Sequence, residues 1–192
     1  METITNTVTK LQIRSELLKF LNSAKSTDKN RYVLNYYHVA NGFLFTTDGR
    51  RAHRIKLSEV NAIGGQLEDG VYNLCCIEKT KLFSVCLVSK EEGQSPSLDS
   101  VWPQSLNQIE DKIFQMNTES MNLTSSILNI FTKTGRAINL DFIKDLHYEK
   151  KFSSWKVCAP KGFDKDDGKP LVFLSENDNV QALILPYKYN KD

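Results

Sequence analysis

The amino-acid sequence predicts an α+β fold in which helices pack on one face of antiparallel sheets. At each end of the 192-residue chain, a strand-like segment and a helix are followed by three strand-like segments. Short turns rich in Gly, Asn and Asp separate these segments, and such turns join neighbouring antiparallel strands. The two ends share this topology with little sequence identity, so the order of elements carries the prediction.

The first helix is predicted after a strand-like segment at residues 7–12. Its apolar side chains recur at helical spacing and form one stripe, while basic and polar residues occupy the opposite side. The stripe consists of Ile13, Leu17, Phe20, Leu21 and Ala24. A polar run at residues 26–30 ends the helix, and we expect the stripe to pack against the sheet that follows.

Three strands are predicted next, at residues 32–40, 43–47 and 51–57, because this region is rich in aromatic and β-branched residues. Asn41-Gly42 and Asp48-Gly49 separate them. Asn-Gly and Asp-Gly favour two-residue hairpin turns, since both central positions of such a turn need positive φ angles. The three strands are therefore expected to form an antiparallel meander.

The middle of the chain leaves two interpretations open. Residues 71–88 form either a hairpin that turns at 78–81 or a strand followed by a helix at 77–87. The apolar alternation is too short to choose between a strand period and a helix period. Residues 89–100 are polar and are predicted to form a loop or linker.

The C-terminal part is predicted to begin with a helix at residues 118–134, which Gly135 ends. A strand at 136–140 and a short helix at 142–146 follow. Three strands close the chain, at residues 155–159, 171–175 and 180–185. Their connecting segments are dense in Asp, Asn, Gly and Lys, which is typical of turns.

Charge and composition exclude several classes of protein. The chain has 25 Lys and Arg against 23 Asp and Glu, and this net charge of +2 argues against a histone-like protein but allows a local basic face. No segment reaches the ~20 apolar residues of a membrane span, and the first ten residues lack the pattern of a secretory signal. We therefore expect a cytoplasmic protein whose four cysteines are reduced thiols rather than a metal or redox site.

No motif in the sequence predicts catalysis or a cofactor. The chain lacks the nucleophile motif G-x-S-x-G and a phosphate-binding loop. His38, His53 and His147 are interpreted as structural, because no patterned Ser or Cys accompanies them. The acidic segment 164–168 departs from calcium-loop spacing and is interpreted as a solvated turn. The residues therefore predict no metal or cofactor site, and an unrelated small α+β enzyme stays one alternative.

Basic residues cluster in two places, at residues 50–56 and at Lys150-Lys151. Each cluster is either a solvated face or a contact for phosphate groups. Nothing in the pattern offers a helix that reads base edges, so any contact with nucleic acid is expected to be independent of sequence.

Three segments resemble motifs of the bacterial β sliding clamps (the β subunit of DNA polymerase III). The hairpin turn at residues 47–52 is similar to the family's T-D-G-H-R-L-A, with Arg50 in place of His and Ala52 in place of Leu. Residues 137–146 resemble F-N-x-x-Y-L-x-D-x-L, and residues 182–189 resemble the closing V-M-P-M-R-L. The three matches occur in the order that the family has.

The resemblance implies a shortened or divergent member of the family, whose chains have three domains. Residues 101–103 resemble the F-P-D-Y that ends a clamp domain, which implies one clamp-like part at 1–100 and a second at 101–192. The alternative is one clamp domain with an insertion at about 58–134. Closing a ring with so few domains would need a trimer or a larger assembly, so the resemblance also implies a homo-oligomer.

The function implied by the resemblance is that of a noncatalytic processivity factor or docking platform on duplex DNA, without sequence specificity. Family helices that face DNA are basic, and the matching positions are Arg14, Lys19, Lys25 and Lys144. Replication and repair proteins insert a short apolar peptide between the T-D-G turn and the closing segment. The matching positions are Thr47, Gly49, Arg50, Arg51, Ala52, Leu185, Pro186 and Tyr187. A clamp-fold adaptor that forms no ring is the alternative.

Overall fold

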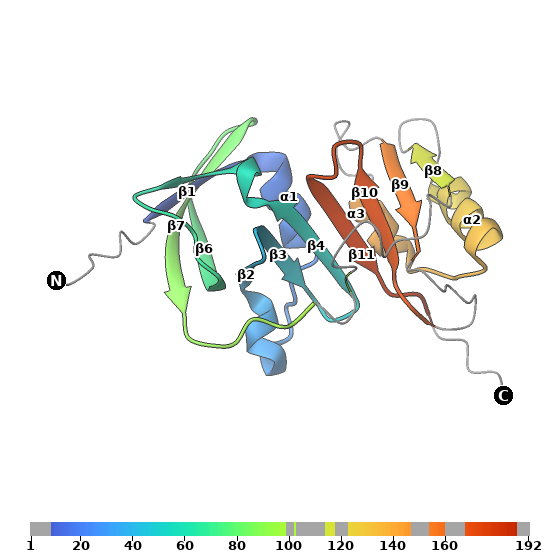
Figure 1. Cartoon of the computed structure of the whole chain (residues 1–192), viewed down its shortest axis with the longest axis horizontal. Helices are drawn as coiled ribbons and strands as arrows, with labels where there is room; N and C mark the ends of the chain where they lie inside the picture. Colours follow the sequence, from blue (N-terminus) through green and yellow to red (C-terminus); the bar gives the residue numbers. More distant parts are fainter. Residues whose placement is uncertain are drawn as a thin grey trace. The chain divides into compact units, whose positions relative to one another are not determined.

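The computed structural model of the chain describes residues 9–98, 102, 114–117, 123–146, 154–159 and 168–187. The chain forms two compact units (Figure 1). The N-terminal unit contains residues 1–49 and 53–96, and the C-terminal unit contains residues 50–52 and 97–192. Both units combine helices with antiparallel strands, which confirms the predicted α+β class.

The N-terminal unit follows the order strand, helix, three strands and then a further antiparallel set. Its first part is β1 (Lys10–Arg14), α1 (Ser15–Ser23), the 3-10 helix η1 (Lys29–Asn35), β2 (Tyr37–Ala40), β3 (Phe43–Thr47) and β4 (Arg51–Lys56), of which the first two residues belong to the C-terminal unit. Its second part is the 3-10 helix η2 (Leu57–Glu59), β5 (Val60–Ile63), β6 (Gly70–Lys79) and β7 (Phe83–Glu91). The strands lie in the order β5-β1-β7-β6-β2-β3-β4.

The first helix begins two residues later than predicted. Ile13 lies in β1, where it pairs with Val60 and Ser84, rather than in the helix. The strand continues to Arg14 because β1 pairs with β7 on one side and β5 on the other, and these ladders outweigh the local helical pattern. The predicted apolar stripe is nonetheless buried, with every member at most 1% exposed.

The predicted strand at residues 32–40 is wrong in its first half. Residues 29–35 form η1, because the Asp28 side chain accepts a hydrogen bond from the Asn30 amide at 2.9 Å and caps this helix. Strand β2 starts only at Tyr37 and turns at Asn41-Gly42, where both residues have positive φ. The Asn-Gly hairpin and β3 are therefore confirmed.

Residues 71–88 form a hairpin, which decides between the two interpretations of this segment. Strands β6 and β7 pair along most of their length, with a bulge between Cys76 and Glu78. Thr80 closes the turn, because its amide and hydroxyl both donate to the Phe83 carbonyl. Strand β5 was not predicted. All four cysteines are free thiols, two exposed and two buried.

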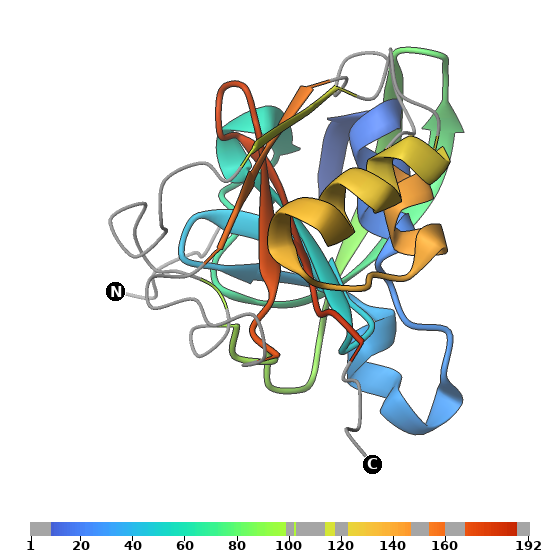
Figure 2. The ribbon, with the colours of Figure 1, turned by 90° about the vertical axis from the view of Figure 1, so that its right-hand side faces the viewer.

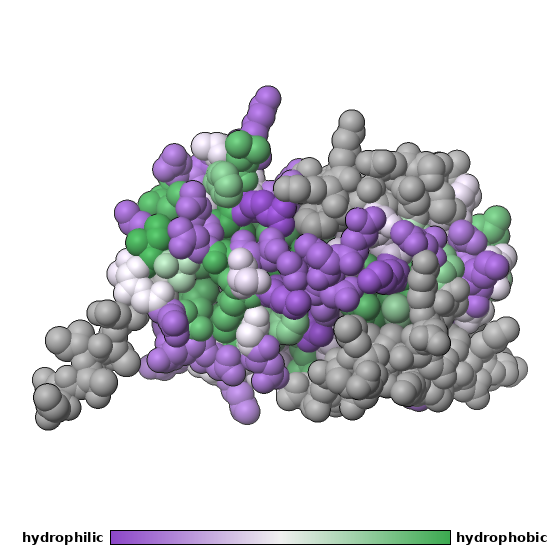
Figure 3. Space-filling view, turned by 45° about the horizontal axis from the view of Figure 1, so that its top comes forward, coloured by the Kyte–Doolittle hydropathy of each residue, from purple (hydrophilic) through white to green (hydrophobic). Residues whose placement is uncertain are grey.

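The sheet of the N-terminal unit exposes apolar and cationic side chains on the face opposite its core. Lys10 stands across from Ile63 on one side and Leu87 on the other, and Arg14 stands across from Phe83. The three apolar side chains are each 44% exposed. Figure 3 shows such apolar groups reaching the surface among hydrophilic ones in this part of the molecule. Cations therefore interrupt the apolar rows across the strands.

The C-terminal unit repeats the order strand, helix and three strands. Its elements are β8 (Phe114–Asn117), α2 (Leu123–Thr134), α3 (Leu140–Leu146), β9 (Ser154–Cys158), β10 (Leu171–Ser175) and β11 (Val180–Ile184). The strands lie in the order β11-β10-β9-β8. Figure 2 shows α2 and α3 together on one side of this sheet. Both ends thus have a strand, helices and then three strands, although the first strand of the C-terminal unit is not the predicted one.

Two predictions for the C-terminal unit are wrong. Residues 136–139 are not a strand; they connect α2 to α3, and Asn139 caps α3 by accepting the Asp141 amide at 2.9 Å. The first strand of this unit is instead β8, which was not predicted and which pairs with β9. Gly135 ends α2 with a φ of 69°, as expected, while the predicted start of this helix at 118–122 lies outside the described residues.

Candidate functional site

Two segments that are far apart in the sequence lie side by side in the C-terminal unit. The Leu185 amide donates to the Arg50 carbonyl at 2.9 Å. Nearby, Ala52 packs with Leu183 and Trp102 in a small cluster in which no member is more than 3% exposed. Residues 50–52 and 183–187, which we call the hairpin–tail pair, thus have a common apolar base.

The end of the hairpin–tail pair presents an aromatic ring to solvent. The Tyr187 amide donates to the Ala137 carbonyl at 2.9 Å, which anchors the backbone. Its side chain is 55% exposed, and Leu185 and Pro186 are half-buried. A chain segment held by its backbone with apolar side chains facing outward suits the capture of a short apolar peptide.

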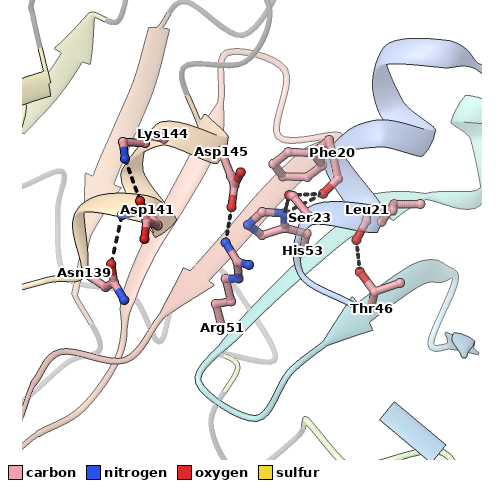
Figure 4. A network of polar contacts seen from close by, with 10 residues as sticks. All are labelled: Phe20, Leu21, Ser23, Thr46, Arg51, His53, Asn139, Asp141, Lys144 and Asp145. Atoms are coloured by element: carbon pink, nitrogen blue, oxygen red, sulfur yellow. Dashed lines mark hydrogen bonds and ion pairs between the residues drawn. The ribbon is translucent and has the colours of Figure 1, made fainter. Parts of the chain in front are cut away.

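Arg51 is the charged residue at the centre of the hairpin–tail pair. Its guanidinium forms an ion pair with Asp145 of α3, as Figure 4 shows. The same group lies over the Phe142 ring, 4.4 Å from its centroid. Arg51 is consequently only 13% exposed, whereas its neighbour Arg50 is exposed.

The remaining two predicted peptide contacts belong to the N-terminal unit. Thr47 is 5% exposed, and its hydroxyl accepts the Gly49 amide at 3.1 Å. Gly49 has a φ of 87°, which a residue with a side chain rarely adopts, so the turn depends on glycine here. Their part in a peptide groove stays a prediction.

Two of the four predicted DNA contacts are engaged by carboxylates. Arg14 pairs with Glu59 at 2.6 Å and with Glu16 at 3.0 Å. Lys144 pairs with Asp141 at 2.6 Å across one turn of α3, and this pair holds the pKa of the Asp141 carboxyl below its usual value. Neighbouring carboxylates offset the charge that a phosphate would meet at these two positions.

The other two predicted DNA contacts differ from each other. Lys19 is exposed on α1. Lys25 is half-buried with its ammonium 5.0 Å from the centroid of the Tyr37 ring, and burial lowers the pKa of Lys25. DNA contact by any of the four residues stays a prediction.

The two buried histidines that the structure describes, His38 and His53, each stack on a phenylalanine ring. His53 stacks on Phe20 at a centroid distance of 4.1 Å, and its Nδ1 lies 2.7 Å from the Phe20 carbonyl. His38 stacks on Phe45 at 5.1 Å. Within the described part of the chain, no three His, Cys, Asp or Glu side chains are grouped as a metal site. His147, Lys150-Lys151 and residues 164–167 lie outside the described residues.

No helix in the described ranges is both long and apolar enough to span a bilayer.

The sequence did not single out the residues that support Arg51. Phe142 and Asp145 lie three residues apart on α3, inside the segment that resembles the family's strand and helix motif, so a signal was present. The sequence could not show that Asp145 pairs with Arg51, because the two residues are 94 positions apart in the chain.

The chain resembles known proteins in its fold but matches none by sequence family. No family model matches the chain, and no curated protein matches it. Solved structures do match. The sliding clamp of Bartonella birtlesii, bound to griselimycin, is 16% identical with a TM-score of 0.52 over 98% of this chain and 69% of its own. The chain has the fold of the bacterial β sliding clamps.

Other sliding clamps give the same result. The clamp of C. crescentus has a TM-score of 0.55 at 13% identity, and that of Helicobacter pylori, bound to a DNA ligase peptide, has 0.52 at 9%. Each match covers 98% of this chain and 68% of the clamp chain. The sliding-clamp fold inferred from three short motifs is therefore confirmed, and the chain spans about two thirds of a clamp's length.

Proposed function

We propose that the chain is a noncatalytic, sliding-clamp-like docking platform that binds duplex DNA without sequence specificity and captures short peptides of replication or repair proteins. The sliding-clamp fold carries this proposal. The hairpin–tail pair supports it, because Arg50–Ala52 and the Leu185–Tyr187 segment are the two stretches that resemble the family's peptide-binding motifs.

The peptide site within the C-terminal unit has three chemical parts. Tyr187 supplies an exposed aromatic surface, Leu185 and Pro186 supply apolar walls, and Arg50 supplies an exposed positive charge. A peptide with an apolar anchor and a neighbouring carboxylate would satisfy all three.

Replacing Leu185 and Tyr187 together with Ala is expected to weaken peptide binding about 30-fold or more, because two apolar contacts at the centre of the site are lost. The measurement is fluorescence anisotropy with the DNA ligase peptide found on the Helicobacter pylori clamp, and calorimetry with griselimycin. The melting temperature should fall by only a few degrees, since Tyr187 is 55% exposed and Leu185 is half-buried rather than part of the core.

The matched control replaces another exposed leucine and tyrosine, Leu82 and Tyr32, which are 72% and 60% exposed in the N-terminal unit. This variant should bind both probes as the unaltered chain does. Equal losses in the two variants would place the site elsewhere, and an unaltered chain that binds neither probe would refute the peptide part of the proposal.

Binding to DNA is expected to be topological. The assembly should stay on nicked circular DNA through gel filtration in moderate salt and should be lost once the circle is cut, because a ring slides off an end while ionic contacts do not depend on ends. Light scattering should show a trimer or larger, about 66 kDa or more from a 21.9 kDa chain.

Two observations favour a second candidate function, a clamp-fold adaptor that docks peptides and forms no ring. Arg14 and Lys144 are both engaged by carboxylates, and the net charge is only +2. An adaptor would be a monomer by light scattering and would elute from circular and linear DNA alike, so the same two measurements decide between the candidates.

A further inference from the structure

The Arg51 side chain makes its main contacts within the chain, which an arginine that binds a peptide would not need. This side chain is 13% exposed, its guanidinium pairs with the Asp145 carboxylate, and the central carbon of the guanidinium lies 4.4 Å from the centroid of the Phe142 ring. An arginine guanidinium recognises a carboxylate with geometric specificity and stacks well on aromatic rings, and both interactions are made here within the chain.

Helix α3 provides a firm support for this contact. Ile143 is fully buried and Leu146 is 1% exposed, so the helix is anchored by its apolar face. The Trp155 indole donates to the Leu146 carbonyl at 3.2 Å, which ties the end of α3 to β9. Phe142 and Asp145 are three residues apart and therefore share one face of the helix.

The residues on either side of Arg51 contact the tail directly. The Arg50 carbonyl accepts the Leu185 amide, and Ala52 packs on Leu183. The Arg51 side chain thus ties to α3 the same three residues that hold the segment carrying Leu185 and Tyr187.

We infer that Arg51 is a positioning residue of the peptide site rather than a peptide contact. Through Asp145 and Phe142 it fixes residues 50–52 on α3, and this fixes the Arg50 carbonyl that holds the tail strand. The inference rests on the proposed function for its binding readout, and it has a second readout that needs no peptide.

The binding test is a double-mutant cycle on Arg51→Ala and Asp145→Ala, using the DNA ligase peptide as the probe. Each single variant should weaken binding by about five- to tenfold, and the double variant should be no weaker than the worse single one, since both remove the same link. Arg51→Lys should recover part of the loss. If Arg51→Ala weakens binding while Asp145→Ala leaves it unchanged, Arg51 contacts the peptide and the inference is wrong.

The second readout is hydrogen exchange at the Leu185 amide in the peptide-free protein. Arg51→Ala and Asp145→Ala should each speed this exchange at least tenfold while the amides of β10 keep their rates, which separates loss of position from unfolding. Lys144→Ala is the matched control, because it removes the exposed Lys144–Asp141 pair of the same helix. Unchanged exchange at Leu185 would overturn the inference, whether or not any peptide binds.

Discussion

Replacing Trp155 with Ala is expected to lower the free energy of unfolding of the C-terminal unit by about 3–5 kcal/mol. Trp155 is fully buried on β9, and its indole N–H donates to the Leu146 carbonyl at 3.2 Å. The substitution removes a large apolar side chain from the centre of the unit and leaves that carbonyl without its donor, so cavity formation and a lost hydrogen bond act together.

The measurement is urea unfolding followed by fluorescence of Trp102, because Trp102 and Trp155 are the two tryptophans of the chain and both belong to the C-terminal unit. Trp155→Phe is the control, since it retains an aromatic ring and should cost clearly less. A loss below about 1 kcal/mol for Trp155→Ala would show that the packing around β9 is not what stabilises this unit.

The N-terminal unit is expected to lose about 3 kcal/mol of stability between pH 6.5 and pH 4 through His38 alone. This side chain is fully buried on β2, and burial lowers the pKa of His38 from 6.5 to about 4. Between these pH values the unfolded chain binds a proton that the folded chain does not, so stability falls as the pH falls. The slope falls away as the pH rises above 6.5 or falls below 4, because the two states then bind the same number of protons at this group.

His38→Phe isolates this contribution, because Phe fills the site against Phe45 and cannot titrate. Carboxylates also titrate in this range, so the quantity to measure is the difference between the unfolding free energies of the two proteins at pH 7.5 and at pH 4. The difference should change by about 3 kcal/mol in favour of the variant at the lower pH. Parallel curves would mean that His38 binds its proton as readily in the folded protein as in the unfolded chain.

Local signals predicted the parts of the fold that depend on neighbouring residues. Asn41-Gly42 adopts the positive φ angles of its hairpin, and β3 and β10 have the predicted bounds. The missed strands β5 and β8 are four residues long, too short for a period of two to stand out. Residues 29–35 have a strand-like composition, yet the cap at Asp28 made them a 3-10 helix.

For the candidate site too, the sequence predicted some features and the tertiary structure decided others. The resemblance named Thr47, Gly49, Arg50–Ala52 and Leu185–Tyr187 as one site, and of these the structure places the Arg50–Ala52 and Leu185–Tyr187 segments together. It also named Arg51 as a peptide contact, whereas the structure commits its guanidinium to Asp145. The predicted DNA contacts were basic residues at positions that match the family's DNA-facing helices, and the sequence could not show that Glu59 and Asp141 engage Arg14 and Lys144.

The amino-acid sequence by itself determined the α+β class, the hairpin turns and the three motifs whose order indicated a sliding clamp, because each depends on residues that are close in the chain. Only the tertiary structure decided where β1 ends, which groups face Arg51 and which cations are paired. Those outcomes depend on contacts between residues that are distant in the chain. The residues next to a side chain in the sequence do not indicate which partner folding will bring to it.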